Sequence, residues 1–328
     1  MVDIYFDSRW VGEHGIGRFA AEIKKSKMNF KFIDNNSNPA GMFDVAFITY
    51  FMARHKGFFF TPGYNAPLFF QNRSVITVHD LNHVDIDHNS SLLKRIYYHF
   101  VLKRACRNAF KVLTVSDFSK RRICEWANIS SDKVIVVGNG VSEEFNLNVD
   151  KYNPGNKYIL IVGNRKKHKN EISSLVAFSR SKISKEIILV LTGNPSEELI
   201  AKIRELCIED RVKFLGNVSN EKLASLYSGA ELLLFPSLYE GFGLPVVEAM
   251  ACGTPVITSN TTSLPEIANG AACLVDPLNI EEISNAISNV CNDKLYRENL
   301  IRKGILQSSR YNWNEVTRKV EDVIKQLQ

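Results

Sequence analysis

Short runs of apolar residues alternate with longer amphipathic stretches along almost the whole chain. In the first half, the apolar runs predict strands at Ile4–Phe6, Phe30–Ile33, Val45–Thr49, Val75–Val78, Val112–Val115 and Val134–Val137. Apolar residues spaced at the helical period predict helices at Gly17–Lys25, Leu92–Phe110 and Asp117–Ala127. This alternation is typical of a parallel sheet whose strands are joined by crossover helices.

Two segments of the first half depart from this pattern. Asn35–Phe43 is rich in Asn, Pro and Gly, and Ala53–Asn72 holds Phe58-Phe-Phe60 next to Thr61-Pro-Gly63. Both are interpreted as loops. Loops at strand ends are where binding residues concentrate in such folds.

A polar, turn-rich segment, Lys151–Asn156, predicts a linker, after which the alternation becomes more regular. Strands are predicted at Tyr158–Val162, Ile187–Leu191, Val212–Leu215, Glu231–Phe235, Pro255–Thr258 and Ala272–Val275. Helices are predicted near 171–181, 196–208, 220–228, 244–251 and 263–269, then at Ile280–Val290, Lys294–Leu306 and Trp313–Gln328. The sequence therefore predicts two α/β domains, both Rossmann-like and doubly wound, facing a central cleft where both sets of strand ends meet.

The composition is that of an ordinary soluble protein, with 328 residues, 45% hydrophobic and 23% charged. The six cysteines form no Cys-x-x-Cys pair, which argues against a zinc site or a disulfide framework and favours a reducing, cytoplasmic compartment. No apolar run is long enough to span a bilayer, and Asp3 interrupts any signal-peptide core. A cytoplasmic protein, peripheral at the inner face of the plasma membrane, is expected.

The net charge of +6 is unevenly distributed. Between Ser91 and Arg122 there are nine basic residues and one acid, with Tyr97, Tyr98 and Phe100 interleaved. Such a segment fits an anionic membrane surface or a lipid diphosphate. A solvated helix face with an apolar underside is the alternative, and nucleic acid is disfavoured because no recognised binding motif accompanies the charge.

One stretch carries the strongest chemical signal. The run Glu231–Phe235 is followed by Glu240-Gly-Phe-Gly-Leu-Pro245-Val-Val-Glu248. The glycines permit a tight turn, and Pro245 suits the first turn of a helix, whose free N–H groups would stabilise a phosphate. Because a carboxylate next to a diphosphate would be repelled, Glu240 and Glu248 are expected to face hydroxyl groups, such as those of a sugar and a ribose.

A cluster of cations follows the first strand of the second domain. Gly163-Asn-Arg165-Lys-Lys-His-Lys169-Asn170 crowds like charges into one loop, an arrangement that is costly unless an anion binds. Arginine can bind a diphosphate as a fork and lysine as a point charge. The alternative is a basic solvated loop.

Three further sites in the sequence are weaker taken alone. Gly15 and Gly17 open a helix after the first strand, His79-Asp80 ends another strand, and Leu215-Gly-Asn-Val218 ends a third. No strand is followed by Gly-x-Gly-x-x-Gly, which argues against a nicotinamide-linked oxidoreductase. The histidines lack metal-ligand spacing, so no metal and no cofactor are expected.

Together these motifs resemble the signature of the retaining glycosyltransferases of family 4, which have the GT-B fold. The resemblance covers nearly the whole chain and is strongest from Tyr158 to Pro277. It implies an N-terminal acceptor-binding domain over 1–152, a C-terminal nucleotide-sugar-binding domain over 157–311, and a last helix, 312–328, that packs back on the N-terminal domain.

The resemblance also implies roles for individual residues. Catalytic roles fall to Glu240, Arg165, Lys169 and His79, donor binding to Gly15, Gly17, Val218, Gly241, Phe242, Gly243, Leu244, Pro245 and Glu248, and acceptor binding to Asp80. The implied reaction is transfer of a hexosyl unit, with mannose from GDP-mannose preferred, from a nucleoside diphosphate sugar to a lipid-linked oligosaccharide. Rhamnosyl, glucosyl and N-acetylglucosaminyl transfer stay open. The rivals from other classes are a noncatalytic sugar-nucleotide-binding module and a basic nucleic-acid-binding protein.

Overall fold

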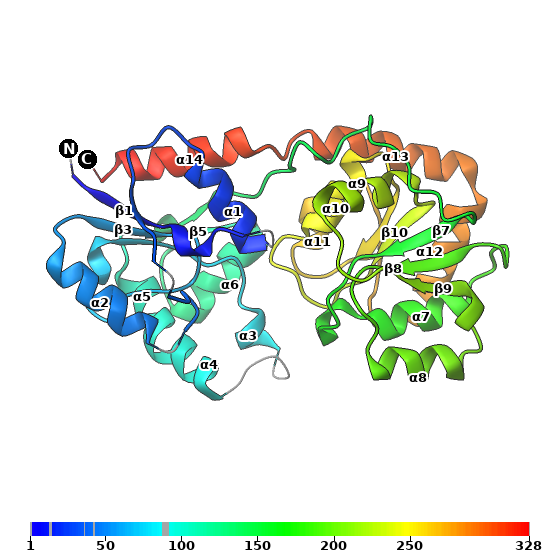
Figure 1. Cartoon of the computed structure of the whole chain (residues 1–328), viewed down its shortest axis with the longest axis horizontal. Helices are drawn as coiled ribbons and strands as arrows, with labels where there is room; N and C mark the ends of the chain where they lie inside the picture. Colours follow the sequence, from blue (N-terminus) through cyan, green and yellow to red (C-terminus); the bar gives the residue numbers. More distant parts are fainter. Residues whose placement is uncertain (1, 13–14, 36, 42, 87–91, 328) are drawn as a thin grey trace. The chain divides into compact units, whose positions relative to one another are not determined.

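A computed structural model of the chain describes residues 2–12, 15–35, 37–41, 43–86 and 92–327. By its contacts the chain divides into two compact units, Met1–Gly140 with Trp313–Gln328, and Val141–Asn312 (Figure 1). Within the described residues, each unit holds a six-stranded sheet in which every paired strand is parallel. The expectation of two doubly wound α/β domains is confirmed.

The sheet of the first unit has the strand order β2-β1-β3-β4-β5-β6. Its strands are β1 (Ile4–Asp7), β2 (Lys31–Ile33), β3 (Phe58–Thr61), β4 (Ser74–Thr77), β5 (Lys111–Thr114) and β6 (Val134–Val136). The chain leaves β1 toward β2 on one side and then crosses to β3 on the other. The order therefore reverses between β1 and β3, which is the position where doubly wound sheets bind ligands.

Helices cover both faces of this sheet. They are α1 (Gly15–Lys24), α2 (Asp44–Arg54), α3 (Asn82–Asp85), α4 (Leu92–Ile96), the π-helix η4 (Tyr97–Leu102), α5 (Lys103–Asn108), α6 (Asp117–Ala127) and α14 (Trp313–Lys325). Phe19 of α1 and Val320 of α14 pack with Phe6 and Phe60 on one face. Leu102 and Ile123 pack with Ile76 and Val112 on the other.

Two predictions for the first unit are wrong. Val45–Thr49 belongs to helix α2 and not to a strand, because the residues buried in α2 recur every fourth position, at Asp44, Ile48 and Met52. Conversely, Phe58–Thr61 is the central strand β3 and not a loop. Phe59 and Phe60 are buried on opposite faces, in separate clusters, so this short run has the continuous apolar character of a strand covered on both sides.

The sheet of the second unit has the order β12-β11-β10-β7-β8-β9. Its strands are β7 (Tyr158–Ile161), β8 (Ile188–Leu191), β9 (Val212–Phe214), β10 (Leu232–Phe235), β11 (Val256–Ser259) and β12 (Cys273–Val275). All six were predicted within a residue or two of these bounds. The order reverses between β7 and β10, whose registered pairs include Leu233 and Leu160.

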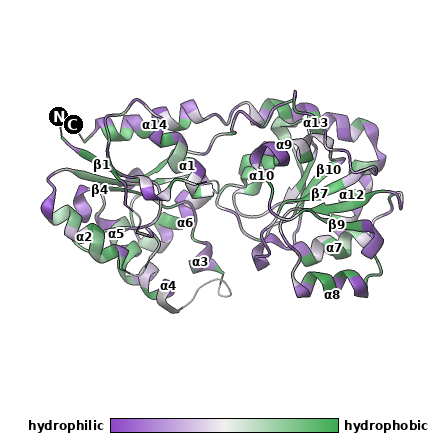
Figure 2. Ribbon diagram, viewed as in Figure 1, coloured by the Kyte–Doolittle hydropathy of each residue, from purple (hydrophilic) through white to green (hydrophobic). Residues whose placement is uncertain are grey.

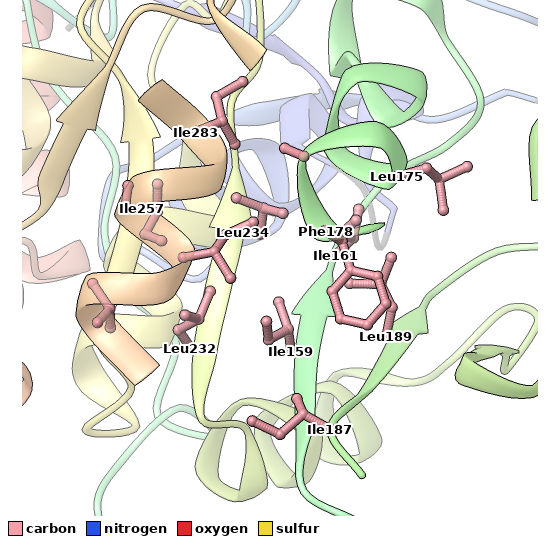
Figure 3. Packing of buried hydrophobic residues seen from close by; sticks show 14 of the residues in the cluster. Ile159, Ile161, Leu175, Phe178, Ile187, Leu189, Leu232, Leu234, Ile257 and Ile283 are labelled. Carbon is pink, nitrogen blue, oxygen red and sulfur yellow. The ribbon is translucent and has the colours of Figure 1, made fainter. Parts of the chain in front are cut away.

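Alternate residues of these strands fill two cores. The helices are α7 (Glu171–Arg180), α8 (Glu197–Glu205), α9 (Asn220–Gly229), α10 (Leu244–Ala251), α11 (Leu264–Ala268), α12 (Ile280–Asn292) and α13 (Lys294–Ser308). Ile159 and Leu234 pack against Phe178 of α7 and Ile283 of α12 (Figure 3). Leu160, on the opposite face, lies in a second core with residues of α9, α10 and α11. Figure 2 shows that the strands are hydrophobic, and that helices such as α8 and α14 have hydrophobic residues on one side and hydrophilic residues on the other.

The chain passes twice between the two units. Residues 141–152, which precede the expected linker, pack in the second unit, where Phe145 joins a buried cluster with Tyr227. At the other end, α14 belongs to the first unit, and Trp313 packs edge-on against Phe19 at 6.4 Å. The second unit is thus connected to the first at both of its ends.

The basic segment, 91–122, forms α4, η4, α5, β5 and the first part of α6, with Ser91 at its start lying outside the described residues. Several of its cations have partners within the protein. Arg122 contacts Asp85 and Glu125, and Arg107 donates to the Ala127 carbonyl. Among the described residues, no helix is both long and apolar enough to cross a membrane.

We expect α14 to stabilise the first unit. Val320 is fully buried against that unit's sheet, so Val320→Ala should lower the free energy of unfolding by about 1.5–3 kcal/mol through lost burial and the resulting cavity. Trp10, Trp126 and Trp313 are the chain's three tryptophans and all lie in this unit, so tryptophan fluorescence during urea unfolding reports on it selectively. Exposed Asn314→Ala is the control, and equal midpoints for both variants would contradict the assignment.

Candidate active site

The strand reversal in the second unit brings two of the predicted motifs together. The cation loop begins after Ile161 at the end of β7, and the Glu240 turn begins after Phe235 at the end of β10. Since β7 and β10 are hydrogen-bonded neighbours, both loops leave the same edge of the sheet. Asn170 joins them, because its side-chain amide donates to the Pro236 and Pro277 carbonyls at 3.0 and 2.7 Å.

Lys169 and Glu240 form a direct ion pair at this edge. Lys169 Nζ donates to Glu240 Oε1 at 2.6 Å, and each side chain is only 14% exposed. Lys169 Nζ also lies 4.8 Å from the ring centre of Phe235. Lys166 and Lys167 are exposed, so the lysine held within the site is Lys169.

Arg165 is held a short distance away by a different acid. Its guanidinium lies 3.2 Å from Glu171 Oε1 and donates to the Thr192 carbonyl. Burial lowers the pKa of Arg165 and raises the pKa of Glu171, because the loss of solvation outweighs their mutual attraction. Arg165 Nη1 is the atom that faces Glu171, whereas Arg165 Nε makes no hydrogen bond among the described residues.

The glycine turn delivers the chain to the start of α10. Gly243 caps this helix with a φ of 99°, and a Cβ there would lie 2.6 Å from Leu264 Cδ2, so only glycine fits. Pro245 follows in the first turn. Ser263 donates to the carbonyls of Glu240 and Phe242, which fixes the turn from the β11 side. The amino end of α10, which has a partial positive charge, therefore follows Glu240 closely in the sequence. Ser263 holds Glu240 and Phe242 in the same turn.

Three further donor-site predictions, Glu248, Phe242 and Val218, lie in the same unit. Glu248 is in α10, 1% exposed, and accepts a hydrogen bond from the Tyr227 hydroxyl at 3.1 Å. Phe242 is buried against the Tyr311 ring at 5.4 Å. Val218 is half-buried at the edge of the second core, just beyond β9.

The first unit brings the histidine motif and the glycine loop together. The His79 ring packs edge-on against the ring of Phe19, with 5.2 Å between the ring centres. Phe19 lies in α1, two residues after Gly17. His79 Nε2 lies 2.8 Å from the Pro62 carbonyl, which can only accept, so Nε2 carries the proton and Nδ1 is the acceptor of the neutral ring. Asp80 accepts from the Asn82 amide at 2.9 Å, just before α3 begins.

A buried polar network at the β1–β3 reversal was not predicted. Arg9 donates to Asp7 at 2.7 Å and to Asp44 at 2.6 Å, and Asn65 donates to both carboxylates. Trp10 and Thr61 both donate to the Asn65 carbonyl oxygen. The network therefore fixes the loop after β3, which contains the Pro62 carbonyl that orients His79.

Gly15 and Gly17 differ in what surrounds them. A Cβ at Gly17 would lie 2.7 Å from the Gly12 carbonyl group, so the turn before α1 requires glycine. A Cβ at Gly15 would meet no described residue within 4 Å. Among the described residues, no contact in the fold requires glycine at position 15.

Several residues that support the site were missed in the sequence. Glu171 faces Arg165, Thr262 accepts from the Glu240 amide at 3.3 Å, and Asn65 is the hub of the network in the first unit. Only Asn170, adjacent to the cation loop, carried a sequence signal. No group of three or more potential metal ligands occurs among the residues that the structure describes.

Two family models match the chain in adjoining segments. "Glycosyl transferases group 1" matches residues 142–307, and "Glycosyltransferase Family 4" matches residues 52–145. The first match spans half of the chain and contains Arg165, Lys169, Glu240 and Glu248. The second contains His79 and Asp80.

Named relatives agree with these models. The chain is 29% identical over 282 residues to O-antigen chain mannosyltransferase B of Escherichia coli, covering 80% of this chain and 74% of that protein. It is 34% identical over 218 residues to O-antigen chain mannosyltransferase RfbU of Salmonella typhimurium, covering 66% and 60%. Anabaena Alr3699/HepE, solved with UDP and glucose, has a TM-score of 0.76 at 18% identity and full coverage of both chains, which shows a common GT-B fold.

The two glycines of the first unit provide a test of ligand contact. We expect Gly15→Ala to leave the unfolding midpoint unchanged or slightly higher, since the methyl group meets no described residue and alanine favours a helix. Gly17→Ala should destabilise, because its methyl group would clash with backbone atoms. If Gly15→Ala nevertheless reduces transfer activity, a ligand approaches position 15. Full activity in this variant would contradict its predicted donor-binding role.

The stability of the first unit should depend on the protonation of His79. Burial lowers the pKa of His79 below its usual 6.5, more than Asp80 and the Pro62 carbonyl raise it. As the pH falls below about 6.5, the unfolded state binds more protons than the folded state, so the free energy of unfolding decreases. Urea unfolding followed by tryptophan fluorescence across pH should show a smaller slope for His79→Gln than for the wild type. Equal slopes would rule out His79 as the source.

Proposed function

The chain belongs to the glycosyl transferases group 1 family, and from this we propose that it transfers a mannosyl unit from GDP-mannose to a sugar hydroxyl of a lipid-linked polysaccharide precursor. The mannosyltransferase names of the two O-antigen relatives support the sugar and the acceptor class. Retention of the anomeric configuration and independence from metal ions are part of the proposal. Rhamnosyl, glucosyl or N-acetylglucosaminyl transfer by the same site is the alternative.

The observation that carries this proposal is the Lys169–Glu240 pair at the amino end of α10. A nucleoside diphosphate leaving group gains negative charge as the glycosidic bond breaks. Lys169, Arg165 and the first amides of α10 are cationic or dipole-positive groups at one sheet edge, and they would stabilise that charge. They would supply the electrostatic stabilisation that a metal ion provides in other enzymes.

Donor binding would exchange the partners of this pair. Lys169 would pass from the Glu240 carboxylate to a phosphate oxygen, which is also an anionic acceptor. Glu240 would then be free to accept hydrogen bonds from sugar hydroxyls, and Glu248 from the ribose. Before binding, each charge is neutralised by the other, so the empty site avoids a buried unpaired ion.

The acceptor is assigned to the first unit. His79 would lie near the transferred sugar, with Asp80 binding the acceptor. Same-face attack on the donor, with a phosphate oxygen taking the acceptor proton, is the mechanism we propose for retention. The acceptor oxygen would bond to the anomeric carbon as the bond from that carbon to the diphosphate breaks, and the hydroxyl proton would pass to the departing diphosphate.

We place the reaction in the cytoplasm, at the inner face of the plasma membrane, with residues 91–122 near anionic lipid. The exposed Arg95, Arg104 and Arg121 support this contact. Arg122 supports it less, since it is engaged with Asp85 and Glu125.

Removing either partner of the pair should reduce transfer sharply. We expect Lys169→Met and Glu240→Gln each to lower kcat by about 100- to 1000-fold. Lys169→Met loses a cation that stabilises developing charge, and Glu240→Gln loses the carboxylate that orients the sugar. The measurement is transfer from radiolabelled GDP-mannose, compared with other nucleotide sugars, to a lipid-linked acceptor extract. Proton NMR of the product gives its anomeric configuration.

Lys167→Ala is the matched control, because Lys167 is an exposed lysine of the same loop, and it should transfer at nearly the wild-type rate. Unchanged transfer by both Lys169→Met and Glu240→Gln would reject the site. Preferred transfer from another nucleotide sugar would replace GDP-mannose while leaving the site intact. Binding of nucleotide sugar without turnover would favour the noncatalytic alternative.

A further inference from the structure

Helix α2 is unusual among the outer helices because the face turned to solvent is apolar. Asp44, Ile48 and Met52 face the core, whereas Phe43 and Tyr50 are 78% and 59% exposed. Successive positions along a helix differ by about 100°, so Phe43, Phe47, Tyr50 and Arg54 form one narrow stripe. Ala46 and Ala53, both exposed, extend this stripe sideways. A helix in contact only with water normally has charged residues there, as α14 has Glu315, Arg318 and Asp322.

The loop after β3 continues the same surface. The Leu68 amide donates to Thr49 of α2 at 2.8 Å, and Arg73 donates to the Met52 carbonyl at 2.8 Å, so residues 68–73 run along the helix. Leu68, Phe69 and Phe70 are 37%, 56% and 39% exposed. We call the exposed side chains of α2 and this loop, Phe43, Tyr50, Leu68, Phe69 and Phe70, the aromatic surface.

The backbone at Phe70 is strained in a way that maintains this exposure. Its φ is 65°, in the left-handed region that bulky residues rarely adopt. Such a conformation is energetically unfavourable and persists where the surrounding structure holds it, most often at functional sites. Here Arg73 stacks 4.8 Å from the Phe70 ring centre and is itself anchored to α2.

Apart from Asp44, the segments that form the aromatic surface carry charge of a single sign. No Asp or Glu occurs from residue 45 to residue 79, while Arg54, Lys56 and Arg73 all do. Arg54 lies 5.0 Å from the Tyr50 ring centre. Asp44, the nearest acid in sequence, is buried and paired with Arg9. Aromatic side chains bordered by cations match the boundary between anionic headgroups and acyl chains.

From these observations we propose that the aromatic surface is a membrane-docking site whose partner is an anionic lipid bilayer, with Tyr50, Phe69 and Phe70 inserted at the headgroup level and Arg54, Lys56 and Arg73 contacting lipid phosphates. The aromatic surface shares no residue with the basic segment 91–122, although the two adjoin where Asn108 donates to Gln71 at 2.9 Å. The docking proposal rests on the proposed function only because a lipid-linked acceptor would lie in the membrane.

The test is flotation of the full chain with vesicles in a density gradient. Wild-type protein should float with vesicles of phosphatidylglycerol and phosphatidylethanolamine and remain below vesicles of phosphatidylcholine alone. The double variant Tyr50→Ser/Phe69→Ser should reduce the vesicle-bound fraction by about tenfold or more, because the inserted apolar area is lost. Arg54→Glu should give a similar reduction, since each cation near an anionic surface contributes about fivefold in affinity and the reversal both removes this attraction and adds a repulsion.

The matched control is Leu278→Ser/Leu295→Ser. These leucines are 77% and 79% exposed in the second unit, so the variant removes similar exposed apolar area elsewhere. It should float as the wild type does. Tryptophan fluorescence during urea unfolding checks that each variant of the first unit is folded.

Four results would overturn the proposal. The first is a wild type that stays below anionic vesicles in the gradient. The second is unchanged flotation of Tyr50→Ser/Phe69→Ser. If Arg104→Glu/Arg121→Glu abolishes flotation while the aromatic variant retains it, docking belongs to the basic segment instead. If sedimentation velocity shows self-association that the aromatic variant loses, without vesicle binding by the wild type, the surface joins two copies of the chain.

Mannosyl transfer to a water-soluble acceptor separates this inference from the proposed function. Tyr50→Ser/Phe69→Ser should retain wild-type transfer to that acceptor, since neither residue belongs to the proposed site. Flotation of a wild type that transfers no sugar would support docking and reject the function. Mannosyl transfer by a wild type that binds no vesicle would support the proposed function and reject docking.

Discussion

The structure depends on the reversal of strand order in two parallel sheets. In the second unit, β7 and β10 are neighbours although more than seventy residues separate Ile159 from Leu232, its registered partner. Their pairing brings the loops that follow them to one sheet edge, where Lys169 bonds to Glu240. A crossover on the opposite side of β7 would separate these loops by several strands. The ion pair is therefore a consequence of topology, and it exists because parallel strands must be joined by crossover connections.

Charge placement follows from the cost of burying ions. Lys169 and Arg165 are both largely shielded, and each faces a different acid, Glu240 or Glu171. For Arg165 and Glu171, desolvation outweighs attraction, so their pKa values shift toward the neutral forms. A site built in this way is stable without its ligand and still presents cations that a diphosphate can recruit. The proposed exchange of Glu240 for phosphate on Lys169 uses one acid both as a counterion and as a sugar ligand.

In the first unit, buried charges are also paired, and their network fixes the loop after β3. Asp7, Arg9 and Asp44 are buried in a network at the β1–β3 reversal, and Asn65 links that network to the loop that holds His79 through Pro62. Buried ion networks are weak sources of stability but fix geometry well. On the outside of the same unit, α2 exposes rings where a water-facing helix would have charges. Both features are consistent with the proposed lipid-linked acceptor and with the proposed position of His79 near it.

The sequence by itself determined the two α/β domains, all the strands of the second unit, and the residue types at the site, because regular alternation and the Glu240–Glu248 motif are local properties of the chain. It did not determine Val45–Thr49 or Phe58–Thr61, since a short apolar run fits a helix or a strand equally until its neighbours are known. Glu171, Asn65 and the exposed face of α2 were decided only by the tertiary structure. Their roles depend on which distant residues lie beside them, and burial, pairing and exposure are set by packing between segments far apart in sequence.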